Sequence, residues 1–129
     1  MDSLNPKYLA GLSPSQRLLQ MRLIQQSQKE YEKTGLVKER PTVSEKKPKR
    51  SQWAKKFEDK YGYPITNLRR VKQDFPTVDV DTILAKGRGA YASSGSRPNV
   101  SSHAWAYARL ASALMGGKAS VVDKKELGK

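Results

Sequence analysis

The chain has 129 residues, of which 36% are hydrophobic, and 25 Lys and Arg against 12 Asp and Glu give it a net charge of +13. This length holds at most one compact domain of ordinary size, and the mean hydropathy of −0.76 predicts that part of the chain orders only against a partner. The absence of cysteine excludes a disulfide framework and thiolate chemistry. Because no apolar run approaches a membrane span or the core of a signal peptide, we expect a soluble protein made inside a cell.

The first predicted element is a helix over residues 14–34. Ser13 is a good N-cap, proline follows at the first helical position, and Gly35 stops the helix. Its apolar residues lie mostly in its first half, so we expect that half to dock and the remainder to project. Leu19, Leu23 and Ile24 form the expected face, which serves either as a partner surface or as ordinary packing onto the rest of the chain.

Residues 36–50 are predicted to form a linker, because Pro41 and Pro48 block a helix and the stretch is strongly charged. A second helix is expected over 52–61, with Trp53, Phe57 and Tyr61 on one face. Such a stripe is more often core than a stacking surface for nucleic acid. A short helix should follow over 67–74, capped by Thr66, with its apolar side inward and its basic residues outward.

The segment from Asp79 to Asn99 is predicted to begin with a short helix, capped by Asp79 or Asp81 and closed by Gly87. A loop rich in glycine, serine and arginine then runs over 87–99 and contains Arg88 and Arg97. The last helix is expected over 103–115, capped by Ser101 or Ser102. We expect Arg97 and Arg109 to hold this loop against the last helix and so to shape a surface for a partner; the alternative is that both arginines point into water.

The charge excess is concentrated in residues 46–72, which hold ten basic and two acidic side chains. Such a segment attracts polyanions, and long basic side chains neutralise phosphates without reading bases. Within it, Lys-Lys-Pro-Lys-Arg at 46–50 also has the composition of a nuclear-localisation patch. The residues expected to contact nucleic acid are Lys46, Lys47, Lys49, Arg50, Lys55, Lys56, Arg69, Arg70 and Lys72.

Motifs that would indicate catalysis are weak. Gly87–Ala92 matches G-x-G-x-x-A, but a dinucleotide site needs a preceding strand, and a helix is expected there. The one histidine, His103, and the lack of cysteine argue against a zinc site of the usual kinds. We therefore expect no catalytic residues, no metal, no cofactor and no enzymatic activity.

The segments Lys86–Asn99, Ser102–Ser112 and Gly116–Ala119 together resemble a family of uncharacterised small proteins encoded by large double-stranded DNA viruses. Chlorella viruses and other giant algal or amoebal viruses are among the viruses that encode this family. The resemblance covers about residues 53–123 and leaves out the N-terminal helix and the lysine-rich linker. It implies a viral origin, which favours a virion component or a genome-associated protein, and it carries no established activity.

The sequence thus predicts a mainly α protein with no convincing sheet: an arm helix and basic linker over 1–50, a small irregular helical module over 51–122 and a charged tail over 123–129 that ends loosely. The first functional hypothesis is a non-enzymatic structural protein of the virion, a minor capsid or internal cementing component, made in the host cytoplasm or acting in the nucleus. The alternatives are a nucleic-acid-binding protein of viral chromatin or packaging, and an accessory subunit of a viral enzyme complex. Expected partners are other virion proteins, with double-stranded DNA or another polyanion also open, and the oligomeric state stays open.

Overall fold

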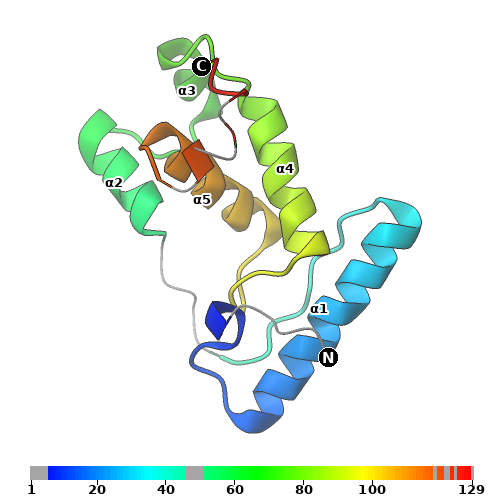
Figure 1. The fold of residues 1–129 in the computed structure, drawn as a ribbon. Helices are drawn as coiled ribbons and strands as arrows, with labels where there is room; N and C mark the ends of the chain where they lie inside the picture. Colours follow the sequence, from blue (N-terminus) through cyan, green and yellow to red (C-terminus); the bar gives the residue numbers. More distant parts are fainter. Residues whose placement is uncertain (1–5, 46–50, 118, 121–122, 124, 129) are drawn as a thin grey trace. The chain divides into compact units, whose positions relative to one another are not determined.

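The computed structural model of the chain describes residues 6–45, 51–117, 119–120, 123 and 125–128, and these residues are mainly α-helical (Figure 1). No β-strand occurs among them, so the predicted fold class is confirmed. In chain order, the elements are a 3-10 helix η1 (Pro6–Leu9) and the helices α1 (Pro14–Thr34), α2 (Gln52–Tyr61), α3 (Leu68–Asp74), α4 (Val80–Ser93) and α5 (Ser102–Leu114).

The chain forms two compact units. Unit 1 contains the described residues within Met1–Lys49 and Arg88–Trp105, and unit 2 contains those within Arg50–Gly87 and Ala106–Lys129. Helices α4 and α5 therefore each contribute residues to both units. The two units group residues that pack together. The segment boundaries predicted from sequence at residues 50 and 122 are a different division of the chain, and they stay a prediction.

Helix α1 begins and ends where its sequence predicts. The Ser13 hydroxyl accepts a hydrogen bond from the backbone N–H of Gln16, and the Gln16 side chain accepts one from the backbone N–H of Ser13, which completes a capping box. At the other end Gly35 adopts φ 72°, and its N–H donates to the carbonyl of Tyr31 at 2.7 Å. Both ends are local signals, so sequence alone locates them.

The helices of unit 2 that precede α4 also match their predicted positions. Ser51 caps α2 and Gly62 ends it, as expected. Helix α3 starts one residue later than predicted because Asn67, and not Thr66, accepts the bond from the backbone N–H of Arg70. Of the two aspartates expected to cap the next helix, Asp79 does so, accepting from the N–H of Thr82 at 3.2 Å.

The prediction of a short helix that closes at Gly87 is wrong, because α4 continues to Ser93. Gly87 and Gly89 lie inside this helix, where they permit close approach instead of ending the helix. A Cβ on Gly87 would lie 2.7 Å from the Cα of Ala106 in α5, and one on Gly89 would lie 3.0 Å from the Tyr31 hydroxyl. The predicted loop over 87–99 therefore shortens to the residues after Ser93.

Helix α5 is close to its prediction. It starts at Ser102 and ends at Leu114, and the Ser101 hydroxyl caps it by accepting from the N–H of Ala104 at 3.1 Å. The thin alanine surface of this helix is what lets Ala106 approach Gly87 so closely. In unit 2, packing between α4 and α5 is thus set by two residues with almost no side chain.

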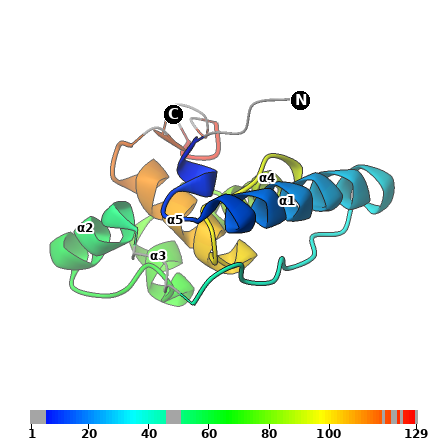
Figure 2. The same cartoon turned by 90° about the horizontal axis from the view of Figure 1, so that it is seen from below.

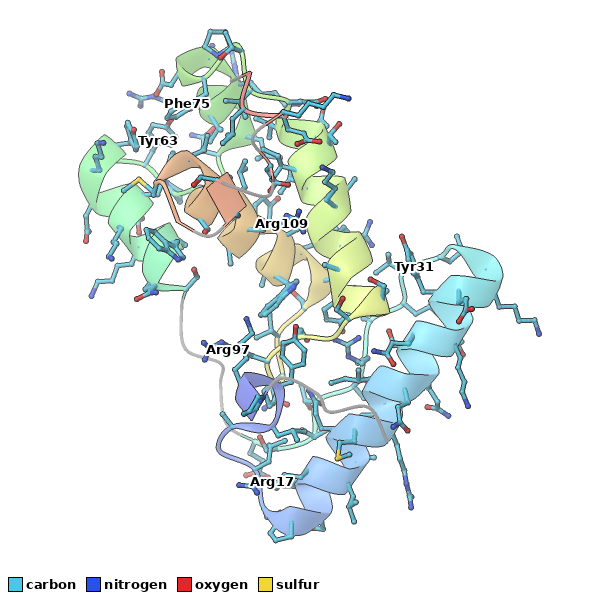
Figure 3. All side chains as sticks on the ribbon, in the orientation of Figure 1. Arg17, Tyr31, Tyr63, Phe75, Arg97 and Arg109 are labelled. Carbon is cyan, nitrogen blue, oxygen red and sulfur yellow. The ribbon has the colours of Figure 1, made fainter. Side chains whose placement is uncertain are left out.

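The core of unit 2 is built on the aromatic face of α2. Phe57 is fully buried, its ring centroid lies 5.4 Å from that of Tyr63, and Tyr61 lies 5.4 Å from Phe75 (Figure 3 labels Tyr63 and Phe75). Trp53 and Tyr61 pack at the edge of the same cluster. The prediction that the α2 stripe is core is confirmed. Further members of this core, all fully or almost fully buried, include Val71, Val80, Ile83, Leu110 and Ala111.

Candidate functional site

Residues 36–45, which were expected within a free linker, pack as a strap in unit 1. The strap returns beside α1 after Gly35 (Figure 2). Its Val43 is buried, and the Val43 N–H donates to the Asn99 side-chain oxygen at 2.9 Å. The Asn99 amide in turn donates to the carbonyl and hydroxyl oxygens of Ser44. The strap is therefore tied to the turn between α4 and α5.

Arg40 is the most heavily bonded residue of the strap. Its guanidinium lies over the Tyr91 ring, 3.7 Å from the centroid, and donates to the Tyr91 carbonyl at 2.7 Å. It also donates to the hydroxyls of Ser96, at 2.7 Å, and Ser27, at 3.0 Å. Burial lowers the pKa of Arg40, although Tyr91 and Glu39 act in the opposite direction. Planar stacking combined with several directed donors is a geometry that arginine provides and lysine does not.

Glu39 binds the start of α5. Its carboxylate accepts a hydrogen bond from the Ser102 N–H at 2.7 Å and another from the Ser102 hydroxyl, which also accepts from the Arg88 guanidinium at 3.3 Å. Burial would raise the pKa of Glu39, but the bonds from Ser102, with His103 and Arg88 nearby, lower it overall. The carboxylate is therefore held in its charged form.

These two adjacent strap residues satisfy two different helix ends. Arg40 places a positive charge at the C-terminal end of α4, where carbonyls lack partners within the helix, and Glu39 places a negative charge at the N-terminal end of α5. Both charges have the sign that a helix dipole favours. We call Glu39, Arg40, Tyr91, Ser96 and Ser102 the strap clamp.

The side of α1 that packs onto the rest of unit 1 carries several polar side chains. The Gln20 amide donates to the carbonyls of Tyr8 and Ser96, the Ser27 hydroxyl to that of Ala92, and the Gln28 amide to that of Ser94. Three of these acceptors belong to the end of α4 or the turn after it. Side chains of α1 thus supply donors to carbonyls that the end of α4 leaves free.

The apolar face predicted for α1 divides between the two sides of the helix. Ile24 is fully buried, which matches the alternative of ordinary packing and not a partner contact, and Leu23 is half-buried. Leu19 is 46% exposed, as a partner contact requires, and the neighbouring Leu18 is 59% exposed. A surface helix ordinarily buries its leucines and exposes its glutamines, and α1 partly reverses this pattern.

The exposed side of α1 is also basic. Arg22, Lys29 and Lys33 are exposed and follow one another at i, i+7 and i+11, which aligns them along one line of a helix. Leu18 and Leu19 lie at the N-terminal end of that line. We call these five residues the outer stripe. Glu30 and Glu32 flank the outer stripe, and Glu30 pairs with Lys38 of the strap at 3.2 Å.

The predicted nucleic-acid residues that the structure describes are all exposed. They are Lys55, Lys56, Arg69, Arg70 and Lys72, whereas Lys46, Lys47, Lys49 and Arg50 lie outside the described residues. Lys56 lies over the Trp53 ring at 4.7 Å and Arg70 over the Tyr63 ring at 4.8 Å. Lys72 pairs with Asp81 at 3.1 Å, which offsets its charge.

In the described part of the chain, the excess of basic residues is not confined to the segment 46–72 that stands out in the sequence. In unit 1 the described residues include nine Lys or Arg against four Glu, and in unit 2 nine against seven Asp or Glu. Among described residues the larger basic excess therefore belongs to unit 1.

The predicted roles of Arg97 and Arg109 are corrected. Arg97 is exposed, which matches the alternative that it points into water. Arg109 donates two bonds, at 2.9 and 2.7 Å, to the carboxylate of Asp123, which is fully buried (Figure 3 labels both arginines). The bonds to Asp123 raise the pKa of Arg109, against the effect of burial. Arg109 thus holds the C-terminal segment, and not the loop after α4.

The C-terminal segment was expected to end loosely, and its described residues do not. Besides Asp123, Leu127 joins the core, and the Glu126 carboxylate binds the Lys86 ammonium of α4. The bond from Lys86 lowers the pKa of Glu126, while its second carboxylate oxygen is buried without a hydrogen-bond partner. These contacts fasten Asp123 to α5, Glu126 to α4 and Leu127 to the core, all within unit 2.

Sites for small ligands are poorly developed in the described ranges. An open depression of about 590 Å³ in unit 1 is lined by Gly11, Gln16 and residues 42–45, of which only Glu45 is charged. No three His, Asp or Glu side chains within residues 6–45, 51–117, 119–120, 123 and 125–128 gather as a metal site requires. No helix in that part of the chain has the length and apolar character that crossing a bilayer requires.

The fold and these surfaces define a small mainly α protein whose strap is clamped by paired charges and whose exposed helix carries leucines and cations. The chain belongs to DUF5824, a family of unknown function whose model matches residues 5–127. No curated protein and no solved structure matches it. The family match includes α1 as well as residues 51–127.

Sequence reasoning missed Glu39, Arg40 and Asp123. Their partners Tyr91, Ser102 and Arg109 lie 14 or more residues away, and no local periodicity marks such pairs. The one available signal was an opposite-charge pair placed directly before Pro41, in a stretch where lysines dominate.

Proposed function

We propose that this protein is a non-enzymatic structural component of a virus particle, a minor capsid or internal cementing protein that binds neighbouring proteins. The supporting observation is the partial reversal of α1, which turns Gln20 and Ser27 inward and leaves Leu18 and Leu19 in water. Leucines that the fold does not use are costly to expose, and a surface that a partner covers removes that cost. The viral setting rests on the sequence resemblance alone.

Particle fractionation tests this proposal. Particles of the virus that encodes the chain are purified, stripped layer by layer with detergent and salt, and analysed by quantitative mass spectrometry. We expect the protein to remain with one structural layer at a copy number comparable to other minor capsid proteins. Its absence from every layer, with the protein present only in infected-cell extract, contradicts the proposal.

A second candidate function, nucleic-acid binding in viral chromatin or packaging, is favoured by the exposed cations of α2 and α3. Lys55, Lys56, Arg69 and Arg70 are exposed, and the Arg70 guanidinium lies over the Tyr63 ring. Each phosphate that such residues neutralise releases counterions and steepens the salt dependence of binding.

Duplex DNA binding over a salt series tests this candidate. Replacing Lys55, Lys56, Arg69 and Arg70 with glutamine should reduce the slope of log affinity against log salt by about 3.6, at about 0.9 per phosphate contact. Helicity should be unchanged, since all four side chains are exposed. A slope equal to that of the wild type moves any contact to other residues, among them the basic run at 46–50.

A further inference from the structure

The outer stripe of α1 combines two features that a solvent-facing helix does not need together. Leu18 and Leu19 are 59% and 46% exposed, and the three cations of the stripe extend from them toward the C-terminal end of the helix. From Leu18 to Lys33 the rise is about 22 Å, or four turns, at 1.5 Å per residue. The stripe is thus an elongated surface with an apolar end and a basic remainder.

The packing of unit 1 does not explain this arrangement. The inward side of α1 is occupied by Gln20, Ser27 and Gln28, whose side chains bond to carbonyls around the end of α4, and by the buried Ile24. A leucine on that side would leave carbonyls without donors. The leucines are therefore excluded from the inward side by its hydrogen bonds, but nothing within unit 1 requires them at the exposed positions, where glutamine or lysine serves equally well.

The charge of the stripe selects among the surfaces that cover it. A second copy of the same stripe would oppose Arg22, Lys29 and Lys33 with identical cations. A membrane-seated helix needs an apolar face along its length, and here the apolar residues occupy one end. A nucleic-acid backbone pairs with the cations but leaves both leucines in water. An acidic helix with apolar residues uses both features, because helices dock through residues spaced i, i+3, i+4 and i+7.

We infer that the outer stripe docks an acidic amphipathic helix of a partner protein, with Leu18 and Leu19 as apolar anchors and Arg22, Lys29 and Lys33 as partners for its carboxylates. This inference rests on the proposed function in requiring a protein partner, and it adds the chemistry of that partner. Rim charges set association and register, while desolvated apolar anchors hold the complex. Both parts of the stripe should therefore contribute to affinity.

The full chain is tested against three labelled synthetic helices about four turns long by fluorescence anisotropy. The first has leucine on one face and glutamate beside it, the second replaces glutamate with glutamine, and the third replaces leucine with alanine. The protein variants are L18A/L19A and R22Q/K29Q/K33Q. The first control is L36A, which removes a leucine that is 63% exposed and lies outside the stripe. The second is K55Q/K56Q/R69Q, which removes an equal number of positive charges, three, from unit 2. Circular dichroism checks that every variant keeps its helicity.

We expect the wild type to bind the first helix at least about tenfold more tightly than the other two, because anchors and charges act together. L18A/L19A and R22Q/K29Q/K33Q should each lose about tenfold or more, and the controls should stay within about twofold. Equal binding of the first and third helices, or unchanged affinity in L18A/L19A, overturns the inference.

Two further measurements test whether the stripe instead binds a membrane or a second copy of the chain. If L18A/L19A abolishes binding to phosphatidylserine vesicles while peptide binding is unaffected, the stripe is a membrane surface and the inference is wrong. It is equally wrong if the wild type sediments as a dimer that L18A/L19A dissociates. All these assays use purified protein, so a negative result contradicts the docking inference alone. Absence of the chain from particles contradicts the proposed function.

Discussion

Arg40 and Arg97 show how the surroundings of a residue, and not its type, determine what it does in this protein. Both precede a proline, and both lie in stretches that look irregular in sequence. Arg40 stacks on Tyr91 and donates to Ser27, Ser96 and the Tyr91 carbonyl, whereas Arg97 is exposed. The sequence singled out Arg97, because glycines and serines around it suggested a shaped loop. The residue that organises this region comes instead from more than 50 positions away.

Replacing Arg40 with lysine should therefore destabilise the protein, and the same change at Arg97 should not. Lysine keeps the charge but loses the planar stack and most of the directed donors, so we expect R40K to lower the free energy of unfolding by about 2 kcal/mol. R97K should stay within about 0.5 kcal/mol of the wild type, as exposed substitutions usually do. Chemical denaturation followed by circular dichroism measures both, and equal stabilities for the two variants would contradict the strap clamp.

Tyr63 provides a prediction that depends on pH. Its hydroxyl donates to the Asp74 carboxylate at 2.8 Å, and burial together with this bond raises the pKa of Tyr63 from 10.0 to about 12. Since the folded state binds this proton more tightly than the unfolded chain, the stabilisation is complete below pH 10 and is lost as the pH rises toward 12.

Y63F should accordingly be less stable than the wild type by about 1 kcal/mol at neutral pH, and the difference should shrink between pH 10 and about 12. Y107F, which removes the hydroxyl of a half-buried tyrosine elsewhere in the same unit, is the control at neutral pH for the loss of a tyrosine hydroxyl. A stability difference between Y63F and the wild type that stays constant through this interval would show that the bond to Asp74 does not persist in solution.

At the scale of elements, local signals predicted helix ends well and distant contacts were beyond them. Ser13, Gly35, Ser51 and Gly62 act through neighbours within four residues, so the bounds of α1 and α2 follow from sequence. The continuation of α4 through Gly87 depends on the backbone of Ala106, which no pattern around residue 87 reveals. The sequence left open whether the apolar residues of α1 pack or bind a partner, because which of them are buried depends on the carbonyls that Gln20 and Ser27 meet.

The two glycines of α4 should respond differently to alanine. In G87A the added Cβ would lie 2.7 Å from the Ala106 Cα, and rigid backbone there cannot yield without moving α5. We expect a loss of about 1–3 kcal/mol from this overpacking, in spite of the better helix propensity of alanine. In G89A the new atom meets the end of the Tyr31 side chain, which can rotate away.

G89A is therefore the matched control, and it should be at least about 1 kcal/mol more stable than G87A because its gain in helix propensity is not cancelled. Thermal unfolding of the two variants, run side by side, gives the comparison. If G87A is as stable as G89A, residues 80–87 and 106 are not packed as closely as the structure describes.

At the scale of the whole molecule, α4 and α5 are the elements that the two units have in common. Residues 88–93 and 102–105 of these helices belong to unit 1, and residues 80–87 and 106–114 belong to unit 2. Breaking a helix in its middle exposes backbone groups and loses cooperative hydrogen bonds. A helix that is required by both units is consequently expected to make their unfolding a single event.

The two tryptophans test this expectation, because Trp53 lies in unit 2 and Trp105 in unit 1. Trp53 packs against the core of unit 2, and Trp105 makes an edge contact with Tyr8 at 6.1 Å, so the fluorescence of each reports its own unit. We expect W105F, observed through Trp53, and W53F, observed through Trp105, each to agree in fluorescence midpoint with circular dichroism of the same variant. Adding R40K, which lies in unit 1, should then lower the Trp53 midpoint along with the Trp105 midpoint, as two-state behaviour requires. A Trp53 midpoint that does not move when Arg40 is replaced would show that unit 2 unfolds independently, and that α4 and α5 transmit no stability between the residues they share.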